Sequence, residues 1–176
     1  MAPVGRLSNG SSFVLPADFV AARVALRPAE LAHGFRSGYL DEQGVVQLAE
    51  HAIESGAPTL PSIEELGLLL SEEYGRVPEL VTEMEESDPS APSEQTNVWL
   101  YLVLAWIYDH RDEFADPLAE IETVHADFDY PEGIEGLVGY LPAAPGQPSG
   151  PGAVEARWKA FLDRQGTHYA RRAVLD

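Results

Sequence analysis

The longest uninterrupted apolar run in the chain is the feature that most restricts its fold. It extends from Val98 to Tyr108 and includes two tryptophans and two tyrosines. Its eleven residues are about half of a helical membrane span, so we expect no transmembrane helix here. A helix that is apolar on every side must be contacted by other elements all around. The run therefore predicts a central buried aromatic helix. The residues expected near the centre of the protein are Trp99, Leu102, Leu104, Trp106 and Ile107.

Most other segments have apolar residues at helical spacing, and no convincing alternation of apolar and polar residues predicts a strand. Caps, prolines and glycines mark the ends of the predicted helices. These helices are 18–26, 28–38, 41–56 with Asp41 as the N-cap and Gly56 as the end, 61–70, 77–86, from Thr96 or Asn97 to about Phe114, 116–128 starting at Asp116-Pro117, 131–138 and 154–172. In the fourth, the side chains expected on one face are Ile63, Leu66, Leu69 and Leu70.

The predicted architecture is mainly α, with a single compact helical domain over residues 13–176. Residues 1–12 are rich in Gly, Ser and Asn, and we expect a flexible N-terminus there. Two loose joints are predicted, one near 88–93 and one in the proline- and glycine-rich segment 142–152.

Acidic residues dominate the charge of the chain. There are 29 Asp and Glu against 11 Lys and Arg, which gives a net charge of −18. Such a field repels nucleic acid and anionic lipid and attracts a basic protein, so we expect a basic protein partner and neither nucleic acid nor a membrane. Residues 41–94 hold 14 of the acidic residues and one basic residue, Arg76, a net charge of −13. The carboxylates predicted to bind the partner are Glu72, Glu73, Glu79, Glu83, Glu85, Glu86 and Asp88. The alternative is a solvated face that only keeps the protein soluble.

The chain lacks the residues that several classes of catalytic and metal-binding sites require. The chain has no cysteine, which excludes disulfides, zinc–thiolate sites and thiol nucleophiles, and which fits a reducing cytoplasm. It has no Gly-x-Ser-x-Gly nucleophile motif and no phosphate-binding loop. No signal peptide is recognisable, so we expect a cytoplasmic protein.

Two Glu-x-x-His pairs form the best enzyme hypothesis in the sequence. Glu30 with His33 and Glu122 with His125 have the spacing found in carboxylate-bridged di-metal sites of helical bundles, which would make the protein an oxidoreductase. However, Gly34 follows His33 within a short segment, whereas such bundles use long helices. We therefore expect no metal, no cofactor and no catalytic residue, with the di-metal oxidoreductase kept as an alternative.

Several strings in the second half of the chain resemble one bacterial family. They are Trp99-Leu-Tyr-Leu, Trp106-Ile-Tyr, Arg111-Asp-Glu-Phe-Ala-Asp-Pro-Leu118, Ala126-Asp-Phe-Asp-Tyr-Pro131, Ile134-Glu, Tyr140-Leu-Pro142 and Trp158-Lys-Ala-Phe. Together they resemble the family called domain of unknown function 2247, well over roughly the last 80 residues and loosely before them. The resemblance implies a small bacterial protein associated with polymorphic toxin loci, and it supplies no catalytic residues.

The sequence therefore predicts a non-catalytic acidic binding protein. The resemblance adds the context of an immunity protein, which would neutralise a cognate bacterial toxin by binding it directly. A regulatory or scaffold protein with a different basic partner is the alternative that charge alone leaves open.

Overall fold

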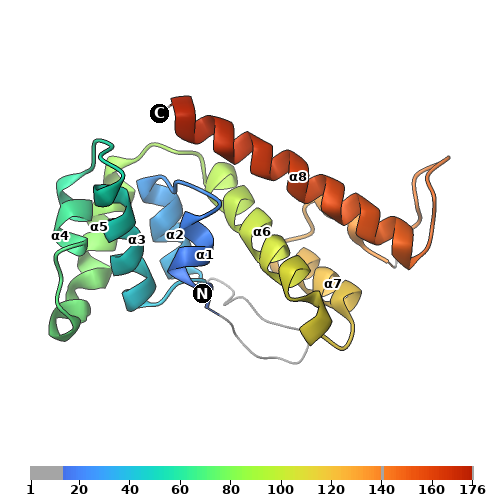
Figure 1. The fold of residues 1–176 in the computed structure, drawn as a ribbon, viewed down its shortest axis with the longest axis horizontal. Helices are drawn as coiled ribbons and strands as arrows, with labels where there is room; N and C mark the ends of the chain where they lie inside the picture. The colour runs from blue at the N-terminus through green and yellow to red at the C-terminus, as the bar shows by residue number, and fades with distance from the viewer. Residues whose placement is uncertain (1–13, 140, 176) are drawn as a thin grey trace.

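The computed structural model describes residues 14–139 and 141–175, and it contains helices and no strand over that part of the chain (Figure 1). In chain order the elements are α1 (Ala17–Ala21), α2 (Pro28–Arg36), α3 (Glu42–Glu54), α4 (Pro61–Leu66), the 3-10 helix η1 (Ser71–Arg76), α5 (Val77–Ser87), α6 (Pro92–Asp109), η2 (Arg111–Glu113), α7 (Pro117–Asp127), η3 (Glu132–Leu137) and α8 (Pro151–Leu175). The predicted mainly α, single helical domain is confirmed. The flexible segment predicted at 1–12 lies outside the described residues.

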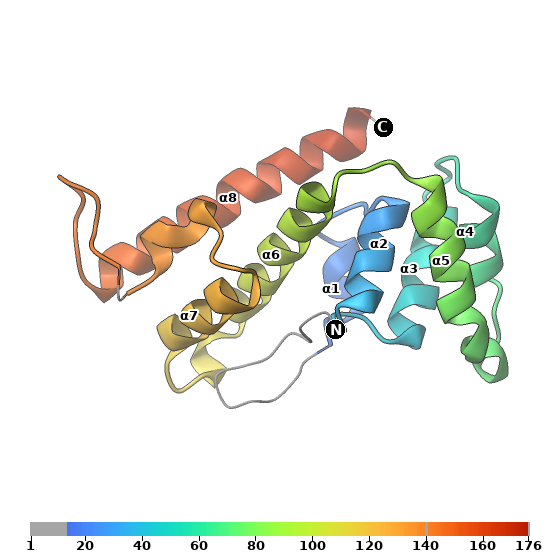
Figure 2. The same ribbon diagram turned by 180° about the vertical axis from the view of Figure 1, so that it is seen from behind.

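Helix α6 lies in the middle of the molecule. Helices α1 to α5 form a bundle on one side of it, and α7 and α8 lie on the other side (Figures 1 and 2). Helix α2 provides the main contact between the bundle and α6, while α8 runs along α6 over much of its length. No described helix combines the length and the apolar character needed to cross a lipid bilayer.

The buried side chains of α6 confirm the predicted central aromatic helix. Trp99, Leu102, Leu104 and Ile107 have no exposed surface. Trp106 is the exception, because it is only partly buried. It lies near the end of α6, where its ring meets Phe19 edge-on, with 4.9 Å between the ring centroids. The prediction was therefore right for four of these five central residues and wrong for Trp106.

Trp99 joins α6 to α2 through a close contact that only glycine permits. The indole Nε1 donates a hydrogen bond of 2.7 Å to the backbone oxygen of Glu30. Four residues later on the same face of α2, Gly34 leaves room for the indole ring. A Cβ atom at Gly34 would lie 2.0 Å from Cζ2 of Trp99. Tyr39 stacks on the indole, with 5.5 Å between the centroids.

Two predicted helix starts and one predicted helix end are confirmed. Asp41 Oδ1 accepts a hydrogen bond of 2.7 Å from the backbone N–H of Gly44 and caps α3. Asp116 Oδ1 accepts from the N–H groups of Leu118 and Ala119 at 3.1 and 3.2 Å and caps α7. Gly56 follows α3 with a φ of 72°, a left-handed conformation that glycine adopts at low cost.

Other predicted boundaries were wrong. The aromatic helix begins at Pro92 rather than after Thr96 or Asn97, because proline is well suited to the first turn, where its missing N–H is not needed. It ends at Asp109 instead of continuing to Phe114. The last helix is also longer than predicted at both ends, since it starts at Pro151 and includes Leu175.

Two more differences concern the N-terminal half. Helix α1 ends at Ala21, although a helix was predicted as far as Leu26. Helix α4 ends at Leu66, so the segment up to Leu70 is not one continuous helix. As a result Leu69 is buried whereas Leu70 is 61% exposed, and the single predicted face is wrong at Leu70.

We predict that Gly34→Ala destabilises the protein by about 1–3 kcal/mol, because the added methyl group must displace the buried Trp99 indole. Gly75→Ala is the matched control, since nothing lies within 4 Å of a Cβ atom at Gly75. Urea unfolding of both variants, followed by circular dichroism, measures the difference. Equal stability of the two variants would contradict the assigned contact.

Candidate functional site

The seven predicted partner-binding carboxylates lie on η1, on α5 and just after α5. Five are exposed and two are half-buried. The exposed ones are Glu72, Glu73, Glu79, Glu83 and Glu86, and the half-buried ones are Glu85 and Asp88.

Three of the seven carboxylates already have partners inside the protein, namely Glu73, Glu85 and Asp88. Glu73 Oε2 accepts a hydrogen bond of 3.0 Å from the backbone N–H of Leu70 at the start of η1. Glu85 Oε2 lies 3.0 Å from Nε of Arg36 and links α5 to α2. These two contacts leave less of each carboxylate free for a partner.

Asp88 has a structural role that the sequence did not reveal. Its Oδ2 accepts a hydrogen bond of 3.0 Å from the N–H of Ala29 in the first turn of α2. Its Oδ1 accepts from the backbone N–H and the hydroxyl of Ser90, at 2.9 and 2.6 Å. Against the effect of burial, these hydrogen bonds lower the pKa of Asp88 and keep it ionised. Asp88 therefore connects the α5–α6 segment to α2, and whether the predicted joint at 88–93 is loose stays a prediction.

The other four carboxylates face solvent and have no hydrogen bond or ion pair among the described residues. We call this set the acidic surface, and it consists of Glu72, Glu79, Glu83 and Glu86. The three on α5 follow helical spacing opposite the buried side chains of the helix. The burial of Val77, Leu80 and Met84 therefore fixes the direction in which these carboxylates point.

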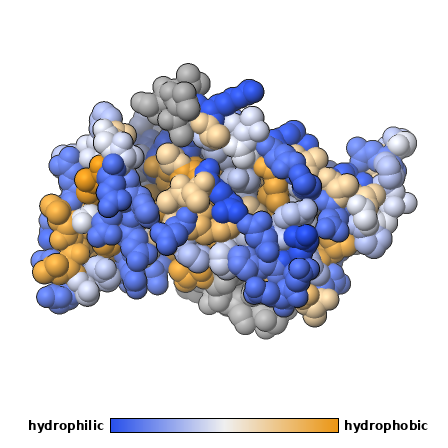
Figure 3. Space-filling model, in the orientation of Figure 1, coloured by the Kyte–Doolittle hydropathy of each residue, from blue (hydrophilic) through white to orange (hydrophobic). Residues whose placement is uncertain are grey.

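Two exposed leucines lie next to the acidic surface. Leu68 is 76% exposed and Leu70 is 61% exposed, in the segment that joins α4 to η1. Figure 3 shows hydrophobic surface at this end of the molecule, bordered by hydrophilic surface. The exposure of these leucines was not predicted, because a continuous helix was expected as far as Leu70. Gly67, immediately after α4, was the signal that the helix stops.

Arg76, the single basic residue of the acidic segment 41–94, already has a carboxylate partner. Arg76 forms an ion pair with Glu65, and their hydrogen bond raises the pKa of Arg76. Glu73 and Glu79 also lie close enough to act on its charge. The negative field of the surrounding carboxylates is therefore only partly offset, and a cation from outside would find free carboxylates here.

The two Glu-x-x-His pairs do not form a shared group. Glu30 is fully buried, and both of its carboxylate oxygens accept hydrogen bonds from Arg172, at 2.6 and 2.8 Å. Its Oε2 also accepts from the backbone N–H of Arg27 at 2.8 Å. His125 is buried beside Tyr130. Over the residues that the structure describes, no three His, Asp or Glu side chains are grouped as metal ligands would be.

We predict that Arg172→Met destabilises the protein by about 3–5 kcal/mol, because Glu30 would keep a buried carboxylate without its guanidinium partner. The exposed neighbour Arg171 provides the control, and Arg171→Met should change stability by less than about 0.5 kcal/mol. Chemical unfolding of both variants measures the difference. If Arg172→Met is as mild as its control, the buried ion pair does not hold α8 in place.

The comparison with known families extends the resemblance seen in the second half of the chain. The model of the family domain of unknown function 2247, described as an uncharacterized protein conserved in bacteria, matches residues 17–166. The match includes α1 to α5 as well as the aromatic helix and most of α8. No curated protein and no solved structure matched the chain. The chain belongs to this family of uncharacterized proteins conserved in bacteria.

Proposed function

We propose that this protein acts by binding a basic protein partner through its acidic surface, without catalysis. The observation that carries the proposal is the set of four exposed carboxylates on η1 and α5 that have no partner among the described residues. Free carboxylates in a chain of net charge −18 attract a cationic protein and speed its association.

The exposed leucines supply apolar contact surface, which the carboxylates alone do not provide. Interface energy usually comes from a few apolar or aromatic side chains that lose their water on binding, while charged groups at the rim set the rate and the specificity. Leu68 and Leu70, beside Glu72, form such a combination. We therefore place the centre of the interface at the two leucines and its rim at the acidic surface.

We further propose that the partner is a cognate toxin domain and that the protein is an immunity protein of the cytoplasm. A toxin that cleaves nucleic acid is basic around its active site, because it must bind phosphates. An acidic protein can occupy that site in place of the substrate. If the partner is instead a basic protein without toxic activity, the same surface supports a regulatory or scaffold function.

The experiment for the toxin proposal is co-expression of the full chain with the toxin encoded beside its gene. We expect the cells to survive and the two proteins to copurify as a stable complex. If the chain neither protects the cells nor copurifies with the toxin, this pairing is rejected. Copurification without protection would favour the regulatory or scaffold function.

A second experiment tests the surface itself. Changing Glu72, Glu79, Glu83 and Glu86 together to Gln should slow association with the copurified partner by about tenfold at low salt, and less at high salt. The control removes four exposed acidic charges from the other half of the molecule, with Asp112→Asn and with Glu113, Glu132 and Glu135 changed to Gln. Association rates from stopped-flow measurements separate the two cases. Equal slowing by both variants would show that net charge acts rather than this surface.

A further inference from the structure

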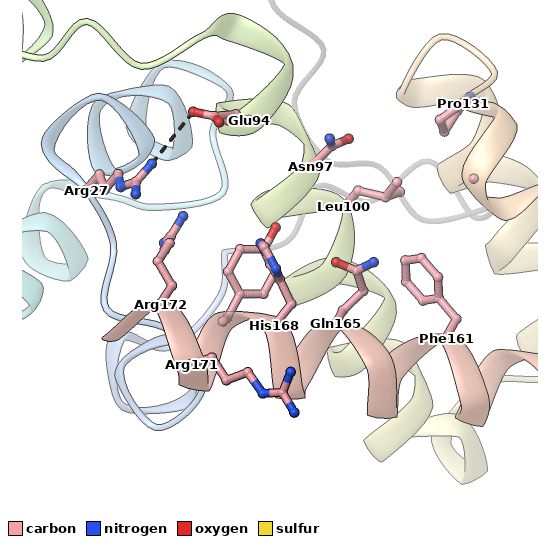
Figure 4. Close-up of a pocket in the computed structure, with 12 residues that line it drawn as sticks. Arg27, Glu94, Asn97, Leu100, Pro131, Phe161, Gln165, His168, Arg171 and Arg172 are labelled. Atoms are coloured by element: carbon pink, nitrogen blue, oxygen red, sulfur yellow. Dashed lines mark ion pairs between the residues drawn. The ribbon is translucent and has the colours of Figure 1, made fainter. Parts of the chain in front are cut away.

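A cleft of about 560 Å³ lies between α6 and α8 (Figure 4), and no residue of the acidic surface lines it. Asn97 and Leu100 line it from α6, and Phe161, Gln165 and His168 line it from α8. Figure 4 shows the side chains from the two helices facing each other across the opening, with Pro131 on a third side. Pockets of this size that combine apolar walls with a few polar groups are typical binding sites for small molecules.

The charge along α8 is opposite to that of the rest of the protein. Residues 151–175 carry five Arg and Lys against two acidic residues, although the chain as a whole has a large excess of carboxylates. Most described basic side chains are engaged by a carboxylate or a backbone oxygen. Arg164 and Arg171 are the two described arginines that make no hydrogen bond or ion pair. Arg171 lines the cleft.

The other arginines at the cleft are held by carboxylates. Arg172 is bound to the buried Glu30. Arg27 lies 3.7 Å from Glu94, a pair in which the side chains are 35% and 54% exposed. Glu94 is thus the one acidic side chain among the cleft-lining residues, and its ion pair with Arg27 is long and partly solvated. A bound anion could compete with Glu94 for Arg27, and the exposed Arg171 adds positive charge at the rim of the cleft.

The walls below these charges are apolar. Leu100, Phe161 and Tyr169 are each less than a tenth exposed. Burial raises the pKa of Tyr169 to about 12, so its hydroxyl stays protonated and neutral at physiological pH. The cleft therefore offers an apolar surface for the body of a ligand and cationic or hydrogen-bonding groups for its charged end.

Pro131, on the third side of the cleft, comes directly after a strained turn in the chain. Asp129 and Tyr130, directly before Pro131, have φ values of 57° and 58°, which are uncommon for residues other than glycine. Consecutive residues in this region carry an energetic cost, and such strain is found preferentially at binding and active sites. The Asp-Phe-Asp-Tyr-Pro string of the sequence thus sets the position of Pro131 at the cleft.

We propose that this cleft binds a small organic anion, with a single carboxylate or phosphate group on an aromatic or aliphatic body. Arg27 faces the charged group, and Leu100, Phe161 and Tyr169 contact the body. The exposed Arg171 lies at the rim of the cleft with its guanidinium directed away from Arg27 (Figure 4), and it adds positive charge there. The strongly negative field of the rest of the protein disfavours a polyanion such as nucleic acid. This site is independent of the acidic surface, so its failure would leave the proposed function untouched.

The first test uses the full chain labelled with ¹⁵N and three probes of similar size: 2-naphthoate, 2-naphthyl phosphate and the neutral 2-naphthalenemethanol. We expect saturable chemical-shift changes at Gln165, His168 and Arg171 with at least one anion, at a Kd in the millimolar range or below. The carboxylate and phosphate probes distinguish which anionic group is preferred. Equal binding of the neutral probe, or no saturable binding of either anion, would overturn the proposal.

The second test uses three exposed single-charge variants. Arg171→Gln should weaken binding of the preferred anion by about fivefold, since it removes the unpaired cation. Glu94→Gln should tighten binding by about twofold to threefold, because it removes the competing carboxylate from Arg27. Arg164→Gln, on the same helix but outside the cleft, is the control and should bind like the original chain. Equal effects of Arg171→Gln and Arg164→Gln, or weaker binding by Glu94→Gln, would argue against this cleft.

Discussion

The contact between the Trp99 indole and the Glu30–Gly34 face of α2 is the interaction on which the rest of the structure depends. Gly34 provides the space for the ring, and the Glu30 carbonyl provides the acceptor for its N–H. The carboxylate of the same Glu30 binds Arg172 at the far end of α8. One turn of α2 therefore connects the N-terminal bundle, the central helix and the last helix. An apolar side chain at position 30 could not serve all three elements, because the carboxylate is needed to bind the buried end of Arg172.

Carboxylates in this protein have two distinct uses. Glu30 and Asp88 bind a guanidinium or backbone N–H groups and fix α2 in place. Glu72, Glu79, Glu83 and Glu86 lie on the surface without partners among the described residues. The first group pays for its desolvation with hydrogen bonds, whereas the second remains solvated and contributes its charge to the field around the molecule. Of these two groups, only the second is available for the proposed contact with a basic protein.

Charge is also segregated in space. Helix α5, with its outward carboxylates, lies in the bundle at one end of the molecule, while the net positive α8 lies across the other half (Figure 1). This separation is why the two proposed sites prefer ligands of opposite sign. The proposed basic protein partner would bind at the bundle, and the proposed small anion would bind at the α6–α8 cleft. The two sites share no residue, because none of the four carboxylates of the acidic surface lines the cleft.

The sequence by itself determined the helical class, the central position of the Val98–Tyr108 run and the caps at Asp41 and Asp116, because hydrophobic spacing and capping are local properties. It also predicted where negative charge is concentrated. It did not reveal that Asp88 caps α2, that Glu30 is buried against Arg172, or that Leu70 faces solvent. These facts depend on partners as far as 142 positions away in the chain, or on which side of a turn a residue falls after packing. Only the tertiary structure decided which carboxylates are occupied and which remain free, since that depends on the groups that folding brings beside each one.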